Sequence, residues 1–142
     1  MGVFRGDKKK NIIIVGCGRF GSAIAAMLSE RNRNVTVIDI NQNAFRKLPS
    51  SYGGFTIEAD GSDIDALTRV RASKADLIVA STGDDNLNIM VAQIAKQIFG
   101  VKQVVARLQD PSKQAAFNDL DIEAIYPALL CVREFERIIN EN

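Results

Sequence analysis

Short apolar runs alternate with amphipathic stretches along the chain from residue 11 onward. Apolar runs of about four to eight residues between polar turns are typical of buried strands, and apolar residues three or four positions apart are typical of helices with one buried face. The strands predicted in this way cover 12–15, 35–38, 55–58, 76–81, 101–108 and 122–126. Because a helix is predicted after each strand, the pattern favours an α/β fold built on a parallel sheet.

The predicted helices differ in how clearly the sequence marks their ends. Ser62 and Asp65 resemble a capping box, which predicts the start of a helix that buries Ile64, Leu67 and Val70. The other predicted helical faces are Phe20, Ile24, Met27 and Leu28; Phe45 and Leu48 after an Asn41 cap; Leu87, Met90, Val91, Ile94 and Ile98; and Ala115 and Phe117 after an Asp110 cap.

The last stretch of the chain is predicted as an amphipathic helix. Ala128, Val132, Phe135 and Ile139 recur at helical spacing opposite charged residues. Either this helix folds back onto the sheet, or it leaves the domain and lays its apolar face on another copy or another protein. We therefore expect a flexible lead-in over 1–10, one α/β domain over 11–127 and a terminal helix over 128–142.

A glycine-rich motif, GCGRFG at residues 16–21, joins the first predicted strand to the first predicted helix. Gly16 allows a tight turn, Gly18 lets the backbone approach a pyrophosphate, and Gly21 lets the helix pack close to the sheet. Asp39 ends the second strand 21 positions after Gly18, close to the offset of about 20 at which an acid binds ribose hydroxyls. This combination predicts a nucleotide site on a Rossmann-like, doubly wound parallel sheet of six strands in the order 3-2-1-4-5-6, with helices on both faces.

In such a sheet the ligand binds outside the carboxyl ends of the strands, where the order reverses between the first and the fourth. Asp60 follows the third strand and is either a ligand contact beside the adenosine or an ordinary turn aspartate. Arg19 lies at the mouth of the helix, where it either pairs with a phosphate or is a surface arginine. The predicted cofactor-binding residues are Gly16, Cys17, Gly18, Arg19, Phe20, Gly21, Asp39, Asp60, Thr82, Gly83 and Arg107.

The carboxylate of Asp39 decides which nucleotide we expect. It would bind a free ribose diol and repel the 2′-phosphate of NADP, and no arginine follows it immediately to compensate. NAD(H), or an adenine nucleotide such as ATP, ADP or AMP, is therefore expected rather than NADP.

The residues favour binding without turnover, so no catalytic residue is predicted. A dehydrogenase needs a substrate pocket and a proton donor or acceptor near the nicotinamide. The chain has no histidine, and Tyr52 and Tyr126 lack the lysine four positions on that short-chain reductases use. Two alternatives stay open: a small NAD-dependent oxidoreductase, and an assembly module whose nucleotide is structural.

Composition narrows the other classes. Eighteen basic and seventeen acidic residues give a formal charge of +1, so there is no electrostatic case for nucleic acid as the main partner. The longest apolar run, 23–28, is far shorter than the roughly 20 residues of a membrane-spanning helix, and a cytoplasmic location is expected. Two cysteines without histidine predict neither a disulfide framework nor a zinc site, and Cys17 is either a small filler or a redox-active thiol.

Further motifs follow the glycine loop in a fixed order. They are VID at 37–39, ADGS at 59–62, AD at 75–76, STGDD at 81–85 with Asn88, and VAR at 105–107. Together with GCGRFG they resemble the nucleotide-binding domain of Trk/Ktr-type potassium-uptake regulators, also called the KTN, RCK or TrkA-N-like domain. The resemblance covers residues 11 to about 127.

The resemblance implies a cytoplasmic regulatory subunit, peripheral to the inner face of the plasma membrane. Such a subunit binds NAD(H) or ATP/ADP, assembles as dimers into a ring and gates a membrane potassium-translocating subunit. By the same resemblance the glycine loop would cradle phosphates with Arg19 assisting, Asp39 would hold the adenosine ribose and Asp60 would lie by the adenine. The distal half of the ligand would be lined by Thr82, Gly83 and Arg107.

The sequence departs from the family pattern in three places. The turn at 119–121 lacks the usual glycine, and Ala128 follows Pro127 where many members carry an acid, which argues against a metal role. The chain also stops without the common C-terminal lobe, which suggests that a separate polypeptide supplies the lobe or that regulation is reduced to the nucleotide domain.

Overall fold

The structure is a computed structural model that describes residues 9–117 and 119–140 of the 142-residue chain. Most of the expected lead-in at 1–10 and the last two positions of the predicted terminal helix lie outside the described residues. The elements are β1 (Asn11–Val15), α1 (Arg19–Glu30), β2 (Asn34–Asp39), η2 (Gln42–Lys47), β3 (Phe55–Glu58), α2 (Ile64–Arg69), η3 (Ala72–Lys74), β4 (Leu77–Ala80), α3 (Asp85–Gln97), β5 (Gln103–Arg107), η4 (Pro111–Phe117), β6 (Glu123–Ile125) and α4 (Pro127–Asn140), where η denotes a 3-10 helix.

The six strands form one parallel sheet in the order β3-β2-β1-β4-β5-β6, which confirms the prediction. Val15, the last residue of β1, pairs with Ile38 of β2 on one side and with Ala80 of β4 on the other. Since the strands are parallel, the chain leaves all three at the same edge of the sheet. The winding reverses between β1 and β4, so the loops after these two strands meet at that edge.

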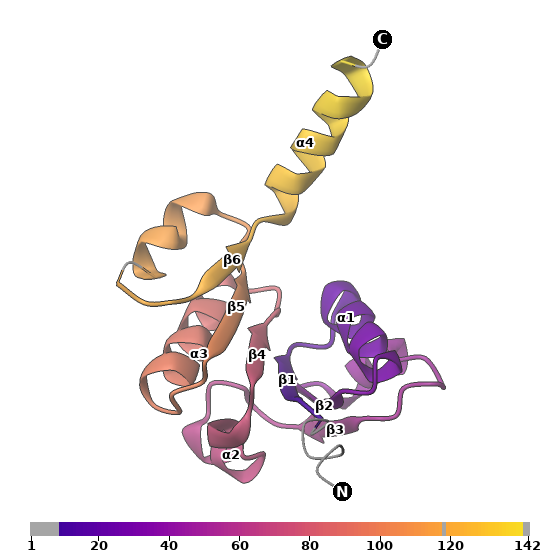
Figure 1. The fold of residues 1–142 in the computed structure, drawn as a ribbon, viewed down its shortest axis with the longest axis vertical. Coiled ribbons are helices and arrows are strands. Elements are labelled where there is room, and N and C mark those ends of the chain that lie inside the picture. Colours follow the sequence, from indigo (N-terminus) through magenta and orange to yellow (C-terminus); the bar gives the residue numbers. More distant parts are fainter. Residues whose placement is uncertain (1–8, 118, 141–142) are drawn as a thin grey trace, which may run out of the picture.

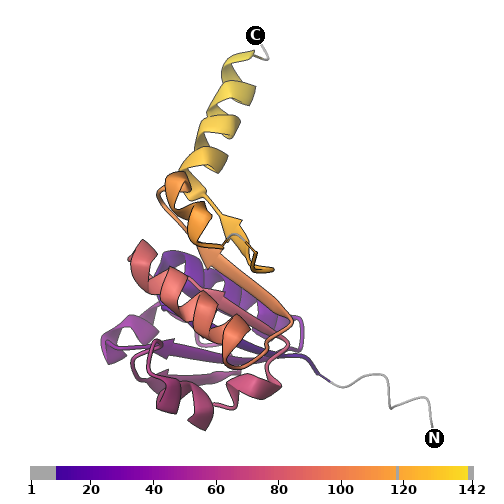
Figure 2. The ribbon, with the colours of Figure 1, turned by 90° about the vertical axis from the view of Figure 1, so that its left-hand side faces the viewer.

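Helices cover both faces of the sheet (Figures 1 and 2). The side chains of α1 and η2 pack on one face, and those of α2, α3 and η4 pack on the other. Alternate residues of β1 point to opposite faces of the sheet. Ile12 and Ile14 belong to the apolar cluster under α1, whereas Ile13 and Val15 belong to the apolar cluster under α2 and α3. The apolar runs at 12–15 and 77–80 are therefore nearly continuous because both of their faces are covered.

The start of α2 differs from the predicted capping box. The N-cap is Asp63, whose carboxylate accepts a hydrogen bond from the N–H of Asp65. Ser62 instead donates its hydroxyl to the carboxylate of Asp60. Aspartate side chains compete well for the N–H two positions on, and this local bonding places the helix start one residue later than predicted. Ile64, in the first turn, is exposed rather than buried.

Apolar side chains at the margins of other predicted helical faces are also exposed. They are Met27 on α1, Met90 on α3, Ile98 at the C-cap of α3, and Ala115 in η4. The buried stripe of each helix is narrower than its sequence period suggests, because small residues such as Ala25 form the contact and bring the helix close to the sheet.

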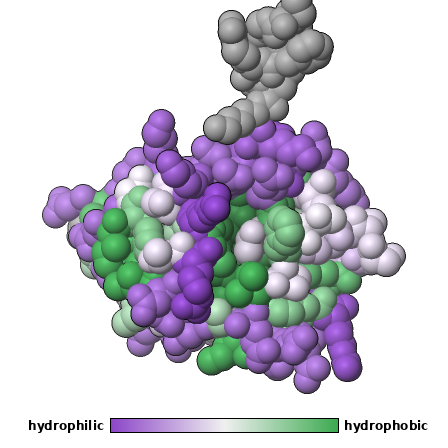
Figure 3. All heavy atoms as spheres, turned by 90° about the horizontal axis from the view of Figure 1, so that it is seen from below, coloured by the Kyte–Doolittle hydropathy of each residue, from purple (hydrophilic) through white to green (hydrophobic). Residues whose placement is uncertain are grey.

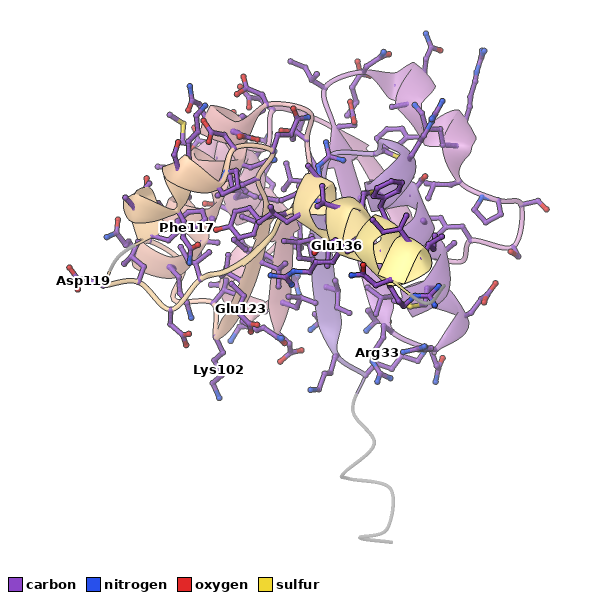
Figure 4. All side chains as sticks on the ribbon, turned by 90° about the horizontal axis from the view of Figure 1, so that it is seen from above. Arg33, Lys102, Phe117, Asp119, Glu123 and Glu136 are labelled. Atoms are coloured by element: carbon purple, nitrogen blue, oxygen red, sulfur yellow. The ribbon has the colours of Figure 1, made fainter. Side chains whose placement is uncertain are left out.

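The turn before β6 keeps a glycine-like backbone without a glycine. Asp119 has a φ of +69°, in the left-handed region that favours glycine and tolerates aspartate. Figure 4 shows Asp119 at the periphery of the half of the molecule that carries Phe117, away from α4. In this turn, which has no glycine at 119–121, Asp119 therefore adopts the left-handed conformation at some cost in strain.

The terminal helix α4 leaves the domain (Figures 1 and 2). None of its residues is buried, and in Figure 4, where the molecule is seen from above, the helix that carries Glu136 lies in front of the domain. Of the two expected arrangements, the structure has the one in which the helix does not fold back onto the sheet. Its exposed apolar residues include Leu129, Leu130, Val132, Phe135, Ile138 and Ile139.

The rest of the surface mixes polar and apolar residues. Seen from below, hydrophilic side chains run across the middle of the molecule between hydrophobic areas (Figure 3). The edge strand β3 is exposed at all four positions. In the part of the chain that the structure describes, none of the helices has both the length and the apolar character that crossing a bilayer requires.

Candidate functional site

A cleft of about 610 Å³ opens at the carboxyl ends of the strands. Its walls come from the residues that end or follow β1, β2, β3, β4 and β5, so it lies across the point where the strand order reverses. Its volume is within the roughly 300–1,000 Å³ of small-molecule sites. The lining residues are Val15 to Arg19, Ile38 to Asn41, Ala44, Lys47, Ala59 to Ser62, Ser81 to Gly83, Leu87 and Arg107.

The glycine loop forms the floor of the cleft. Gly16 has a φ of +105°, its N–H donates to the carbonyl of Ile38 over 2.7 Å, and an added Cβ would lie 2.8 Å from the nitrogen of Thr82. The hydroxyl of Ser81 lies 3.1 Å from the carbonyl oxygen of Gly16 and joins the loop to the end of β4. Only a residue without a side chain fits here, so the turn is fixed by its neighbours.

The first turn of α1 faces the cleft without side-chain capping. Gly18 is the N-cap, and among the residues that the structure describes no side chain caps the start of the helix. A Cβ added at Gly18 would meet nothing within 4 Å, so the backbone here is open to a ligand. Free N–H groups at a helix start bind anions well, and phosphate is the group expected at this point.

Asp39 is held from two sides by the backbone. One carboxylate oxygen accepts a hydrogen bond from the N–H of Cys17 and the other accepts one from the N–H of Asn41, each over 2.8 Å. The first bond joins the end of β2 to the glycine loop. Each carboxylate oxygen has a second acceptor site, so a fixed carboxylate remains able to accept from two neighbouring hydroxyl groups such as those of a ribose.

Asp60 is bound locally rather than free. Its carboxylate accepts hydrogen bonds from the N–H and the hydroxyl of Ser62, and these bonds lower the pKa of Asp60. A Cβ added at Gly61 would lie 2.2 Å from Cγ1 of Val15, so the loop after β3 can close over the end of β1 only with glycine there. Asp60 is thus both a turn aspartate and a cleft residue.

A buried amide organises the far side of the cleft. The side chain of Asn88 binds the N–H, hydroxyl and carbonyl of Thr82 and also donates to the carbonyl of Arg107. The guanidinium of Arg107 donates from Nη2 to the carbonyl of Thr82 over 3.0 Å, while its Nε is buried without a hydrogen-bond partner among the described atoms. An unpaired buried donor costs free energy.

Cys17 is buried in the floor of the cleft at 1% exposure. Burial raises the pKa of its thiol, and the carboxylate of Asp39 raises it further against the opposing effect of Lys47. A thiol held in its neutral form is a weak nucleophile. The structure therefore favours Cys17 as a small filler over a redox-active thiol.

All the predicted site residues line the cleft except Phe20 and Gly21. Phe20 packs in the cluster under α1, and Gly21 is needed for packing, because an added Cβ would lie 1.9 Å from the carbonyl oxygen of Gly16. Both act on the site through α1 rather than by lining it.

Sequence reasoning missed several lining residues, and among them are Asn41, Lys47 and Leu87. Asn41 lies two positions after Asp39, and that proximity was the available signal. Lys47 comes from η2, which packs beside α1, and no spacing rule indicated that its ammonium group would share the cleft with Asp39. Asn88 was singled out with the STGDD motif, but its role was not predicted, because the sequence does not show which groups a buried amide binds.

Known proteins resemble this chain in sequence. The family model of the TrkA-N domain matches residues 12–127. The chain is 38% identical over 115 residues to the Trk system potassium uptake protein TrkA of Streptomyces coelicolor, covering 81% of this chain and 52% of that protein. It is 32% identical over 109 residues to the TrkA homolog of Pyrococcus abyssi, covering 77% and 48%. The chain thus spans about half the length of these relatives.

Solved structures share the fold. The TrkA-N domain of the inner membrane protein YbaL from Escherichia coli has a TM-score of 0.80 at 13% identity, covering 93% of this chain and 98% of that one. The GsuK RCK domain has a TM-score of 0.77 at 20% identity, covering 93% and 28%. GsuK structures bound to ADP and to NAD match with a TM-score of 0.70 each, at 17% and 18% identity, covering 84% of this chain and 32% and 22% of those chains. Since the family model matches residues 12–127 of the 142-residue chain, the chain belongs to the TrkA-N domain family.

Proposed function

We propose that this chain is a nucleotide-binding regulatory subunit of a potassium transport system. NAD(H) or an adenine nucleotide occupies the cleft, with its phosphates at the start of α1. The chain works at the inner face of the plasma membrane as a dimer or larger ring, beside a potassium-translocating subunit. Support for the transport role comes from the relatives that carry the name Trk system potassium uptake protein.

The fixed carboxylate of Asp39 carries the nucleotide part of the proposal. Its two backbone hydrogen bonds orient it before any ligand arrives, so little ordering is lost on binding. Gly18 and Gly83 have open space where a Cβ would project, which leaves room for phosphate and sugar groups against the backbone. The guanidinium of Arg107, a residue that lines the cleft, supplies donors at the other end.

The same residues support NAD(H) over NADP. A 2′-phosphate would approach the carboxylate of Asp39, and the like charges would repel. Lys47 lies on the same side of the cleft and reduces that repulsion. We expect the preference for NAD over NADP to persist because the ammonium group of Lys47 is on an exposed, flexible side chain, whereas Asp39 is held in place.

The cleft is proposed to bind its nucleotide without chemical turnover. Among the described lining residues, those that titrate are Cys17, Asp39, Asp60, Lys47 and the two arginines. The thiol has a raised pKa, the carboxylates are engaged by backbone N–H groups, and the chain contains no histidine. The relatives named for potassium uptake point the same way.

A regulatory nucleotide acts only through different affinities for two arrangements of the assembly. In the described structure α4 is the element that leaves the domain, and it follows β6, which pairs with the β5 strand that ends at Arg107. Arg107 pairs with Ile125 of β6, which lies two residues before α4 begins at Pro127. A ligand held by Arg107 is therefore one strand away from the start of α4. This proximity is how we propose that binding reaches the partner surface.

The test is the pair Asp39→Asn and Glu58→Gln, compared by calorimetry with NAD⁺, NADP⁺ and ADP. Hydrogen bonds to a charged group are worth about 1.5–3 kcal/mol, so Asp39→Asn is expected to weaken NAD⁺ binding by roughly 10- to 100-fold and to narrow the preference over NADP⁺. Glu58 pairs with Asp39 in the sheet but does not line the cleft, so its variant should bind like the wild type.

Two results would contradict the proposal. Equal NAD⁺ affinities for wild type and Asp39→Asn would remove the ribose role of this carboxylate. Light scattering measures the size of the wild-type assembly with and without each nucleotide. If that size does not change, the nucleotide is structural rather than regulatory.

A further inference from the structure

Asn88, in the first turn of α3, is the least exposed of the buried polar residues in the described chain, at 0%. Its Oδ1 accepts from the N–H of Thr82 over 2.9 Å and from the hydroxyl of Thr82 over 2.6 Å. Its Nδ2 donates to the carbonyl of Thr82 over 3.0 Å and to the carbonyl of Arg107 over 2.8 Å. The hydrogen-bonding capacity of the amide is therefore used by the protein, and none is left for a ligand.

These four bonds connect two walls of the cleft from behind. Thr82 follows β4, and Arg107 is the last residue of β5. Both line the cleft, whereas Asn88 does not. The carbonyl of Thr82 also accepts from the guanidinium of Arg107, so one buried amide fixes both the backbone of Arg107 and the acceptor that holds its side chain.

The glycine loop divides the cleft into two halves. Asp39 and Asp60 come from the β2 and β3 side, and Thr82 and Arg107 come from the β4 and β5 side. A mononucleotide with one phosphate needs only the first half and the start of α1. A dinucleotide, or a nucleotide with more phosphates, extends across the point where the strand order reverses. Asn88 touches only the second half.

We propose that Asn88 is a positioning residue that selects ligands extending past the first phosphate. It does so by holding the loop after β4 and the end of β5 at a fixed separation. Without the amide, the N–H of Thr82 and the carbonyl of Arg107 lose their buried partners, and the loop must move to restore hydrogen bonding. That movement changes the second half of the cleft and leaves the first half in place. The inference rests on the proposed function, because it requires a nucleotide in the cleft.

The experiment compares Asn88→Ala with the wild-type chain, using AMP as the short ligand and ADP, ATP and NAD⁺ as the longer ones. Affinity for the longer ligands that the wild type binds is expected to fall about tenfold or more, while AMP affinity stays within about twofold. Val91→Ala is the matched control: Val91 is equally buried on the same helix but packs in the apolar cluster. Val91→Ala should lower the thermal stability without changing the ratio of the affinity for AMP to the affinity for the longer ligands.

A second variant keeps the test decisive if Asn88→Ala does not fold. Thr82→Val removes the hydroxyl that binds the side chain of Asn88 and the backbone of Asp84, and it leaves the amide of Asn88 in place. Thr82→Val is expected to lower the affinity for the longer ligands more than the affinity for AMP, by a smaller factor than Asn88→Ala does.

The possible outcomes separate this inference from the proposed function. If the wild type binds AMP and a longer ligand but the variants lower both equally, or leave the ratio unchanged, the positioning role is overturned. If the wild type binds AMP alone, it is also overturned, because no ligand then uses the second half. If the wild type binds no nucleotide, the proposed function fails and this inference fails with it.

Discussion

Two glycines of the same loop are expected to respond in opposite ways to one added methyl group. At Gly21 the methyl carbon would lie 1.9 Å from the carbonyl oxygen of Gly16 and 2.9 Å from the hydroxyl of Ser81. At Gly18 it would meet nothing within 4 Å, and the backbone there, with φ −85° and ψ −163°, suits alanine. Gly21→Ala should therefore act on folding and Gly18→Ala on ligand binding.

The magnitudes follow from these distances. An ordinary carbon to carbonyl oxygen contact is about 3.3 Å or more, so Gly21→Ala must move either α1 or the loop by more than about 1 Å. Overpacking in a well-packed site costs about 1–3 kcal/mol and occasionally more, and backbone on both sides of this contact places the cost near the upper end. For a domain of this size that corresponds to a fall in melting temperature of roughly 6–12 °C.

Gly18→Ala should leave the free energy of unfolding within about 1 kcal/mol of the wild type. Restricting the unfolded chain stabilises by about 0.4–1 kcal/mol, and the poorer N-cap preference of alanine offsets this by a similar amount. The methyl group would instead stand where a phosphate approaches the start of α1. Nucleotide affinity is expected to fall by about tenfold or more, which corresponds to at least about 1.4 kcal/mol.

Urea denaturation followed by circular dichroism gives the stabilities, and calorimetry with NAD⁺ and ADP gives the affinities. A Gly21→Ala protein as stable as the wild type would refute the packing role of Gly21. A Gly18→Ala protein that unfolds much more easily, or that binds nucleotide as the wild type does, would refute the idea that the loop is open to a phosphate at that position.

Two further predictions concern the loops around α2. Arg71 has a φ of +60°, a conformation that costs a residue with a side chain about 1–2 kcal/mol. Arg71→Gly should therefore raise the free energy of unfolding by up to about 1 kcal/mol, whereas Arg69→Gly at the end of α2 should lower it by a similar amount. Urea denaturation of the two variants would measure both changes. The pKa of Asp60 is lowered from its ordinary value of 3.8 by the N–H and hydroxyl of Ser62, so the stabilisation from this carboxylate is present above pH 3.8 and is lost as the pH falls through the lowered pKa. Ser62→Ala should raise the pKa of Asp60 toward 3.8 without reaching it, because the backbone N–H remains; carboxyl titration by NMR that shows no change would contradict this assignment.

The sequence alone was sufficient for the architecture. Apolar runs with polar turns located every strand to within a few residues, and the rules for parallel sheets then fixed the strand order. The glycine loop and Asp39 could be related across 21 residues because one strand-helix-strand unit has a nearly constant size. These features depend on local periodicity and on connections between neighbouring elements, which a linear pattern records directly.

Only the tertiary structure decided how the side chains share their hydrogen bonds. The start of α2 moved because Asp60 and Asp63 each bind an N–H two positions on, a local competition that a capping pattern does not resolve. Asn88 joins Thr82 to Arg107, residues 25 apart in sequence, and Lys47 reaches the same cleft as Asp39 from η2. Such contacts arise where separate elements cross at the edge of the sheet, so their partners are set by packing in three dimensions and not by spacing along the chain.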